Sequence, residues 1–157
     1  MSDVKLSIEH FSAGNALLSI QVGDATYAIY ASYLSPGGHT RDSLEDMAYL
    51  GASAKRGVPM EVWFEGEPQQ WRLSVSPDPA PPGAVDVTVH SFQDRVKRMP
   101  RELGEPVFKA SCSGAEFARA VRHAFSVWKH SAEDYEVRWY HPFPARAFSL
   151  LEEALSS

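Results

Sequence analysis

Apolar residues alternate with polar residues in three runs near the start of the chain, covering 4–8, 16–22 and 27–33. A period of two is typical of strands that bury one face. The pairs Gly14-Asn15 and Gly23-Asp24 separate the runs, and glycine accepts the positive φ that tight hairpin turns require. The first third of the chain is therefore expected to form three antiparallel strands.

Three later stretches space their apolar residues as helices do. The first covers about 42–56, with Thr40 as a candidate N-cap. The second follows Ser113, which begins a Ser-Gly-Ala-Glu capping box and leads into a run with one apolar face at 117–128. A shorter terminal helix is expected at about 146–155.

Three further strands are expected at about 62–65, 71–75 and 85–89, because apolar residues alternate there too, and a last strand is expected at about 107–110. Four prolines within 77–83 predict a stiff loop between the second and third of these strands. Neither side of that loop would build a convincing core alone. The expected fold is a single α+β domain over 1–157. It combines a mostly antiparallel sheet of about six to seven strands with two to three helices, the long C-terminal one packed on the sheet.

Charge is distributed unevenly along the 157 residues, whose formal net charge is −5. Residues 1–94 hold five basic and twelve acidic side chains, a net charge of −7, whereas 95–157 have a net charge of +2. Binding to a phosphate backbone needs clustered lysine and arginine. A general nucleic-acid binder is therefore not expected, and the acidic first part is the better place to seek a basic protein partner.

Cysteine content and hydropathy bear on the compartment. Cys112 is the only cysteine, so the chain forms no intrachain disulfide. The start, Met1-Ser2-Asp3-Val4-Lys5, has no secretory signal pattern, and no apolar run approaches the length of a membrane helix. A cytoplasmic protein without membrane contact is expected.

Catalytic and metal-binding motifs are not evident in the sequence. His123 and His130 share a helix face but lie about 10.5 Å apart along its axis, too far to bind one metal ion. The loop 36–40 matches no phosphate-binding motif, and Cys112 is more easily explained as a core residue than as a nucleophile. No metal, cofactor or catalytic residue is assigned. A site assembled from dispersed histidines and carboxylates stays open as an alternative.

Two kinds of surface could serve a protein partner. Acidic residues of the first helix and the second hairpin, together with one tryptophan, are the candidate partner-binding residues: Asp42, Glu45, Asp46, Glu61, Glu65, Glu67 and Trp63. Aromatic residues are the other candidates, because Tyr30 and Trp63 lie on the opposite phase from their aromatic neighbours and so reach the second face of a sheet. The segment 139–143 is interpreted as packing on the core rather than as an exposed recognition loop.

The order of elements resembles that of small bacterial immunity proteins of polymorphic-toxin systems. The resemblance rests on the paired segments Val62-Trp63-Phe64-Glu65 and Trp71-Arg72-Leu73 and on the helix from Phe117 to Trp128. It implies a non-enzymatic, cytoplasmic protein that neutralises a cognate toxin by binding it. No diagnostic motif accompanies the resemblance, so it assigns no functional residue. The alternatives are a small-ligand-binding domain or enzyme, and a self-associating accessory subunit. The oligomeric state is left open.

Overall fold

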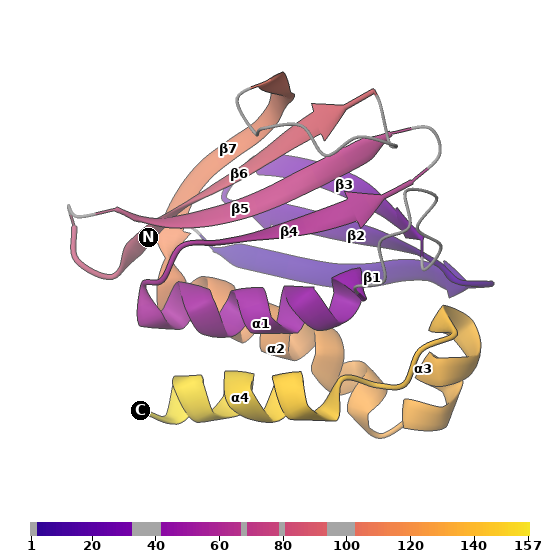
Figure 1. Cartoon of the computed structure of the whole chain (residues 1–157). Coiled ribbons are helices and arrows are strands. Elements are labelled where there is room, and N and C mark those ends of the chain that lie inside the picture. The colour runs from indigo at the N-terminus through magenta and orange to yellow at the C-terminus, as the bar shows by residue number, and fades with distance from the viewer. Residues whose placement is uncertain (1–2, 33–41, 67–68, 79–80, 94–102) are drawn as a thin grey trace.

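The chain folds into two antiparallel sheets above a layer of helices (Figure 1). The computed structural model describes residues 3–32, 42–66, 69–78, 81–93 and 103–157. The three-stranded sheet has the order β1-β2-β3, and the four-stranded sheet has the order β4-β5-β6-β7. The strands are β1 (Val4–Ser12), β2 (Asn15–Val22), β3 (Ala25–Ser32), β4 (Met60–Glu65), β5 (Gln70–Asp78), β6 (Ala84–Phe92) and β7 (Glu105–Ser113). The helices are α1 (Ser43–Arg56), α2 (Gly114–Lys129), α3 (Ala132–Trp139) and α4 (Ala145–Ser156).

The α+β class and the antiparallel pairing are confirmed, while the finer architecture differs in two respects. The seven described strands form two sheets instead of one, because α1 intervenes between β3 and β4 and no ladder joins those strands. The described part of the chain also contains a fourth helix, α3, which sequence periodicity did not predict. With eight residues, only two of them buried, α3 is too short to give a clear apolar stripe.

Tight turns set the register of the three-stranded sheet. Ala13 and Gly14 both have positive φ between β1 and β2, and Gly23 has a φ of 59° between β2 and β3. These turns pair Ser7 with Ser19 and Ser19 with Ala28 across the sheet. The predicted hairpins are therefore present.

Side-chain caps begin the two longest helices. Asp42, rather than Thr40, caps α1, since its carboxylate accepts hydrogen bonds from the backbone N–H groups of Leu44 and Glu45. Thr40 lies outside the described residues. Ser113 caps α2 as expected, with its hydroxyl accepting from the backbone N–H of Glu116.

One hydrophobic core joins the two sheets and the helices. The inner faces of both sheets contribute to it, and α1 packs against β4 and β5 while α2 packs against β1. α4 lies against α1 and α2 on the side away from the sheets (Figure 1). A hydrogen bond of 3.1 Å from the indole N–H of Trp71 to the hydroxyl of Tyr27 links the sheets directly.

Within the described part of the chain, no helix combines the length and apolar character needed to cross a membrane.

Candidate functional site

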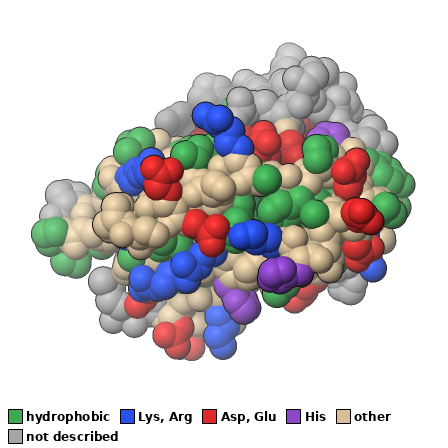
Figure 2. Space-filling view, turned by 90° about the horizontal axis from the view of Figure 1, so that it is seen from below, with side chains coloured by type: hydrophobic (Ala, Val, Ile, Leu, Met, Phe, Trp, Pro, Cys, Tyr) green, Lys and Arg blue, Asp and Glu red, His purple; other side chains and the backbone are tan. Residues whose placement is uncertain are grey.

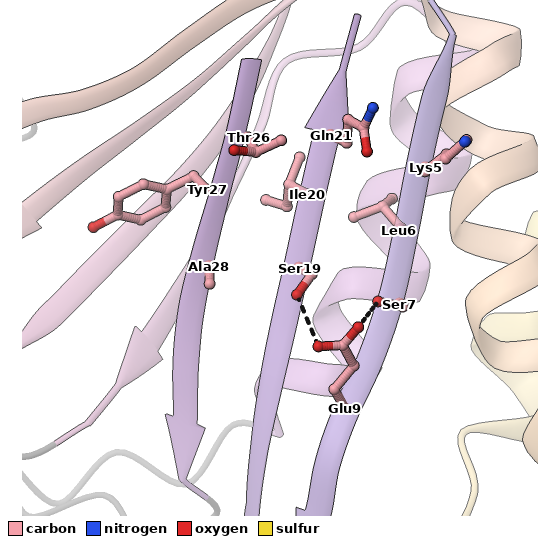
Figure 3. Close-up of a pocket in the computed structure, with 10 residues that line it drawn as sticks. All are labelled: Lys5, Leu6, Ser7, Glu9, Ser19, Ile20, Gln21, Thr26, Tyr27 and Ala28. Atoms are coloured by element: carbon pink, nitrogen blue, oxygen red, sulfur yellow. Dashed lines mark hydrogen bonds between the residues drawn. The ribbon is translucent and has the colours of Figure 1, made fainter. Parts of the chain in front are cut away.

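The outer face of the three-stranded sheet carries a hollow of about 690 Å³ (Figure 3). Strand register explains the hollow, because three rows of side chains cross this face. The middle row contains only small residues, whereas the rows on either side contain longer ones. The rows are Lys5, Gln21 and Thr26; Ser7, Ser19 and Ala28; and Glu9, Leu17 and Tyr30. The hollow is therefore a trough that runs across the strands.

A fixed carboxylate forms part of one wall of this trough. Glu9 is exposed, and its two carboxylate oxygens accept hydrogen bonds from the hydroxyls of Ser7 at 3.0 Å and Ser19 at 3.3 Å. Figure 3 shows the carboxylate held between the two serines. An acceptor that is already oriented loses less conformational entropy when a donor from a partner binds to it.

An aromatic side chain, Tyr30, lies beside the trough, in the same row across the sheet as Glu9 but two strands away from it. Tyr30 is 58 % exposed, and its register partner Leu17 is half-buried beside it. Large exposed aromatic rings are typical of the anchor residues of protein interfaces. The phase of Tyr30 in the alternation predicted its outward position. The hydrogen-bonded position of Glu9 was not predicted, although Ser7 and Glu9, two positions apart on one strand, signal a shared face.

The structure separates the predicted acidic residues into two groups. Asp42, Glu45 and Asp46 lie at the start of α1, while Glu61, Trp63 and Glu65 share the outer face of β4. Glu67 lies outside the described residues. Asp46 and Glu65 are buried, so they do not add to an exposed acidic surface.

A second hollow, of about 420 Å³, brings Asp42 and Glu45 together with His141. Much of the hydrogen-bonding capacity of Asp42 is used inside the protein, because the same carboxylate oxygen that caps α1 also accepts from the indole N–H of Trp139 at 2.8 Å. Asp42 therefore has a structural role, since it caps α1 and accepts a hydrogen bond from Trp139. Its neighbours Glu45 and His141 are half-buried.

A polar cluster is buried at one end of the outer face of the four-stranded sheet. Arg72 is 2 % exposed, and its guanidinium lies 3.2 Å from the ring centre of Trp63 and 4.5 Å from that of Phe92. Gln70 is fully buried and lies in register between Glu65 and Phe92. Trp63 therefore packs on a cation of its own chain and is only half-exposed.

Two described groups, Cys112 and Tyr135, have a raised pKa that keeps them protonated near neutral pH. Burial raises the pKa of the Cys112 thiol to about 11, so the thiol stays protonated. Burial, reinforced by the nearby carboxylates of Asp42 and Glu45, raises the pKa of Tyr135 far above its ordinary value. Within the described ranges, no three histidine, cysteine or acidic side chains are grouped so that they could hold a metal ion.

The chain matches no protein-family model, no curated protein and no solved structure.

Proposed function

We propose that this protein is a non-enzymatic binding module that associates with another protein through the outer face of its three-stranded sheet, where Tyr30 lies beside the trough. The observation that carries the proposal is the combination of an exposed ring, Tyr30, with a carboxylate, Glu9, that two serine hydroxyls hold in place. Tyrosine is enriched among residues that dominate binding energy, and a preorganised acceptor adds specificity.

The side chains in and beside the trough indicate the shape and charge that the partner's surface should have. The middle row of small side chains leaves room for a ridge that crosses the strands, such as a protruding loop. A hydrogen-bond donor, lysine or arginine in particular, satisfies the free lone pairs of Glu9, and an apolar group covers Tyr30 and Leu17. The net charge of −7 over 1–94 favours encounter with a basic protein.

The test is affinity capture from the source cells with three forms of the protein. Wild type and Val58→Asp, a change at a residue that is 51 % exposed outside the trough, should recover the same protein in one-to-one amount. Tyr30→Asp should lose it, because a charge replaces the anchor ring. Recovery of that protein by Tyr30→Asp at wild-type yield contradicts the proposal.

The resemblance to immunity proteins supports a narrower form of the proposal, in which the partner is a bacterial toxin. In that form, the captured protein should harm cells when expressed alone, and co-expression of this chain should restore growth. A captured protein that is harmless alone argues against the toxin while leaving the binding function intact.

Self-association is the competing use of the same face. Sedimentation velocity distinguishes self-association from binding of a different protein, because it measures the mass of the particle in solution. A 17.4 kDa monomer leaves the trough open to a different protein. A dimer that Tyr30→Asp dissociates supports the accessory subunit instead.

A small-ligand function is the second candidate, and the hollow formed by Asp42, Glu45 and His141 favours it. Two carboxylates there suit a small cation, so 1,4-diaminobutane is the appropriate probe. This candidate predicts a saturable shift of the His141 ring signals that Glu45→Gln weakens. No shift at millimolar concentration contradicts it.

A further inference from the structure

A third hollow, of about 410 Å³, lies between the helices on the side of the molecule away from the sheets. Its apolar floor includes Phe143, which is half-buried, and Phe148, which is buried, with ring centres 5.7 Å apart. The ring of Phe143 also contacts the rings of Tyr135 and Phe125, so buried core residues support the floor of the hollow. A firm apolar floor suits an inserted side chain. We call this hollow the α3 hollow.

The two sides of the α3 hollow differ in charge. On one side, Glu133 and Glu136 are exposed on α3, three residues apart, and no described cation pairs with either. On the other side, Lys129 is already paired with Glu152 at 3.7 Å and lies over the ring of Phe148. Like charges at this helical spacing repel each other, and a cation placed between them relieves the repulsion.

Two more carboxylates lie around the same aromatic residue. The hollow that contains Asp42 and Glu45 shares Pro142, Phe143 and Ala145 with the α3 hollow. Figure 2 shows carboxylates beside hydrophobic side chains at the right-hand end of this view, where α3 lies. An apolar floor bordered by carboxylates thus faces solvent at this end of the molecule.

From these charges and this floor we infer that the α3 hollow is a second docking surface, one that binds a polypeptide segment with an aromatic or large aliphatic side chain flanked by lysine or arginine. The apolar side chain enters over Phe143 and Phe148, and the flanking cations lie against Glu133 and Glu136. This inference does not depend on the trough, because the two surfaces share no residue.

The test uses three capped tripeptides and backbone NMR. Acetyl-Arg-Phe-Arg-amide should give saturable shifts at Ala132, Glu136 and Phe148, and the affinity should fall as salt is added. Acetyl-Arg-Gly-Arg-amide lacks the apolar group and acetyl-Glu-Phe-Glu-amide has the wrong charge. Each should bind at least fivefold more weakly.

Paired variants separate local charge from net charge. Glu133→Gln with Glu136→Gln should weaken binding of acetyl-Arg-Phe-Arg-amide by threefold to tenfold. Asp24→Asn with Glu105→Gln changes the net charge equally at exposed positions that do not line the α3 hollow, and should leave the affinity within a factor of two. The inference is overturned if no saturable shift occurs at these residues, if the glycine peptide binds as well as the phenylalanine peptide, or if both double variants behave alike. Because the trough is untouched, these outcomes leave the proposed function unaffected.

Discussion

At the residue scale, Gln70 is a buried polar group whose side chain finds no hydrogen-bond partner among the described residues. The residue is fully buried, and neither its amide nitrogen nor its amide oxygen has a hydrogen-bond partner among the described residues. A buried amide without partners costs about 1–3 kcal/mol.

Replacing Gln70 by methionine should therefore leave the free energy of unfolding unchanged or raise it by about 1 kcal/mol, since the volume is kept and the unpaired atoms are removed. Urea denaturation measures this change. Leu73→Ala, at a buried position on the same strand, is the control for a true packing loss of about 2–5 kcal/mol. A loss of 2 kcal/mol or more in Gln70→Met would show that water or a ligand satisfies the amide.

Cys112 provides a pH-dependent prediction. Its pKa is raised to about 11 in the folded protein, from an ordinary value near 9, so loss of the proton favours the unfolded chain. Its contribution is fully present below pH 9 and is lost as the pH rises towards 11. Over that interval, wild type should lose about 2 kcal/mol more unfolding free energy than Cys112→Ala. If the free energy of unfolding depends on pH in the same way in wild type and Cys112→Ala, the raised pKa of Cys112 is contradicted.

At the element scale, one carboxylate ties two helices together. Asp42 caps α1 and accepts the indole N–H of Trp139, which lies at the end of α3 and is buried. This contact joins segments that are 97 residues apart in sequence. It also holds the connection between α3 and α4 beside the start of α1.

Asp42→Ala should lower the free energy of unfolding by about 2–3 kcal/mol, because the cap contributes about 1 kcal/mol and the indole N–H is left buried without a partner. Asp42→Asn keeps a hydrogen-bond acceptor and should lower the free energy of unfolding by less than Asp42→Ala does. Chemical denaturation of Asp42→Ala, Trp139→Phe and the double variant isolates the coupling between the two residues. A loss no larger than that of Asp24→Ala, an exposed turn position, would contradict this role.

Several elements were predictable from the sequence because their signals are local. Alternation marked the strands, glycine marked the turns of the three-stranded sheet, and Ser113 marked the start of α2. α3 was missed because its two buried residues, Tyr135 and Trp139, contact partners distant in sequence, such as Phe11. The division into two sheets was missed because strand alternation does not encode which strands pair across an intervening helix.

At the scale of the whole molecule, some features of the candidate site were predictable from local sequence and others depend on how distant segments pack. The outward position of Tyr30 followed from its phase within one strand. The contact of Glu9 with Ser19 depends on register, and the burial of Asp46 and Glu65 depends on tertiary packing. Charge along the sequence therefore overstated the exposed acidic surface of the folded protein.

The two proposed binding surfaces are separate, because the trough and the α3 hollow share no lining residue. The trough is lined by residues of the three-stranded sheet, and the α3 hollow is lined by residues of α2, α3, α4 and the connection between α3 and α4. Figure 1 shows the sheets and the helices as separate layers. The proposed binding function rests on the outer face of the three-stranded sheet, which carries both the exposed ring of Tyr30 and the oriented carboxylate of Glu9.

Calorimetric titration of the purified partner into wild type, Tyr30→Ala and Val58→Ala tests that claim most directly. Wild type and Val58→Ala should bind one partner per chain with affinities within a factor of two. Tyr30→Ala should bind about 30-fold more weakly, as expected when an anchor residue worth about 2 kcal/mol is removed. Equal affinity of Tyr30→Ala and wild type would contradict the claim that the outer face of the three-stranded sheet is the binding surface.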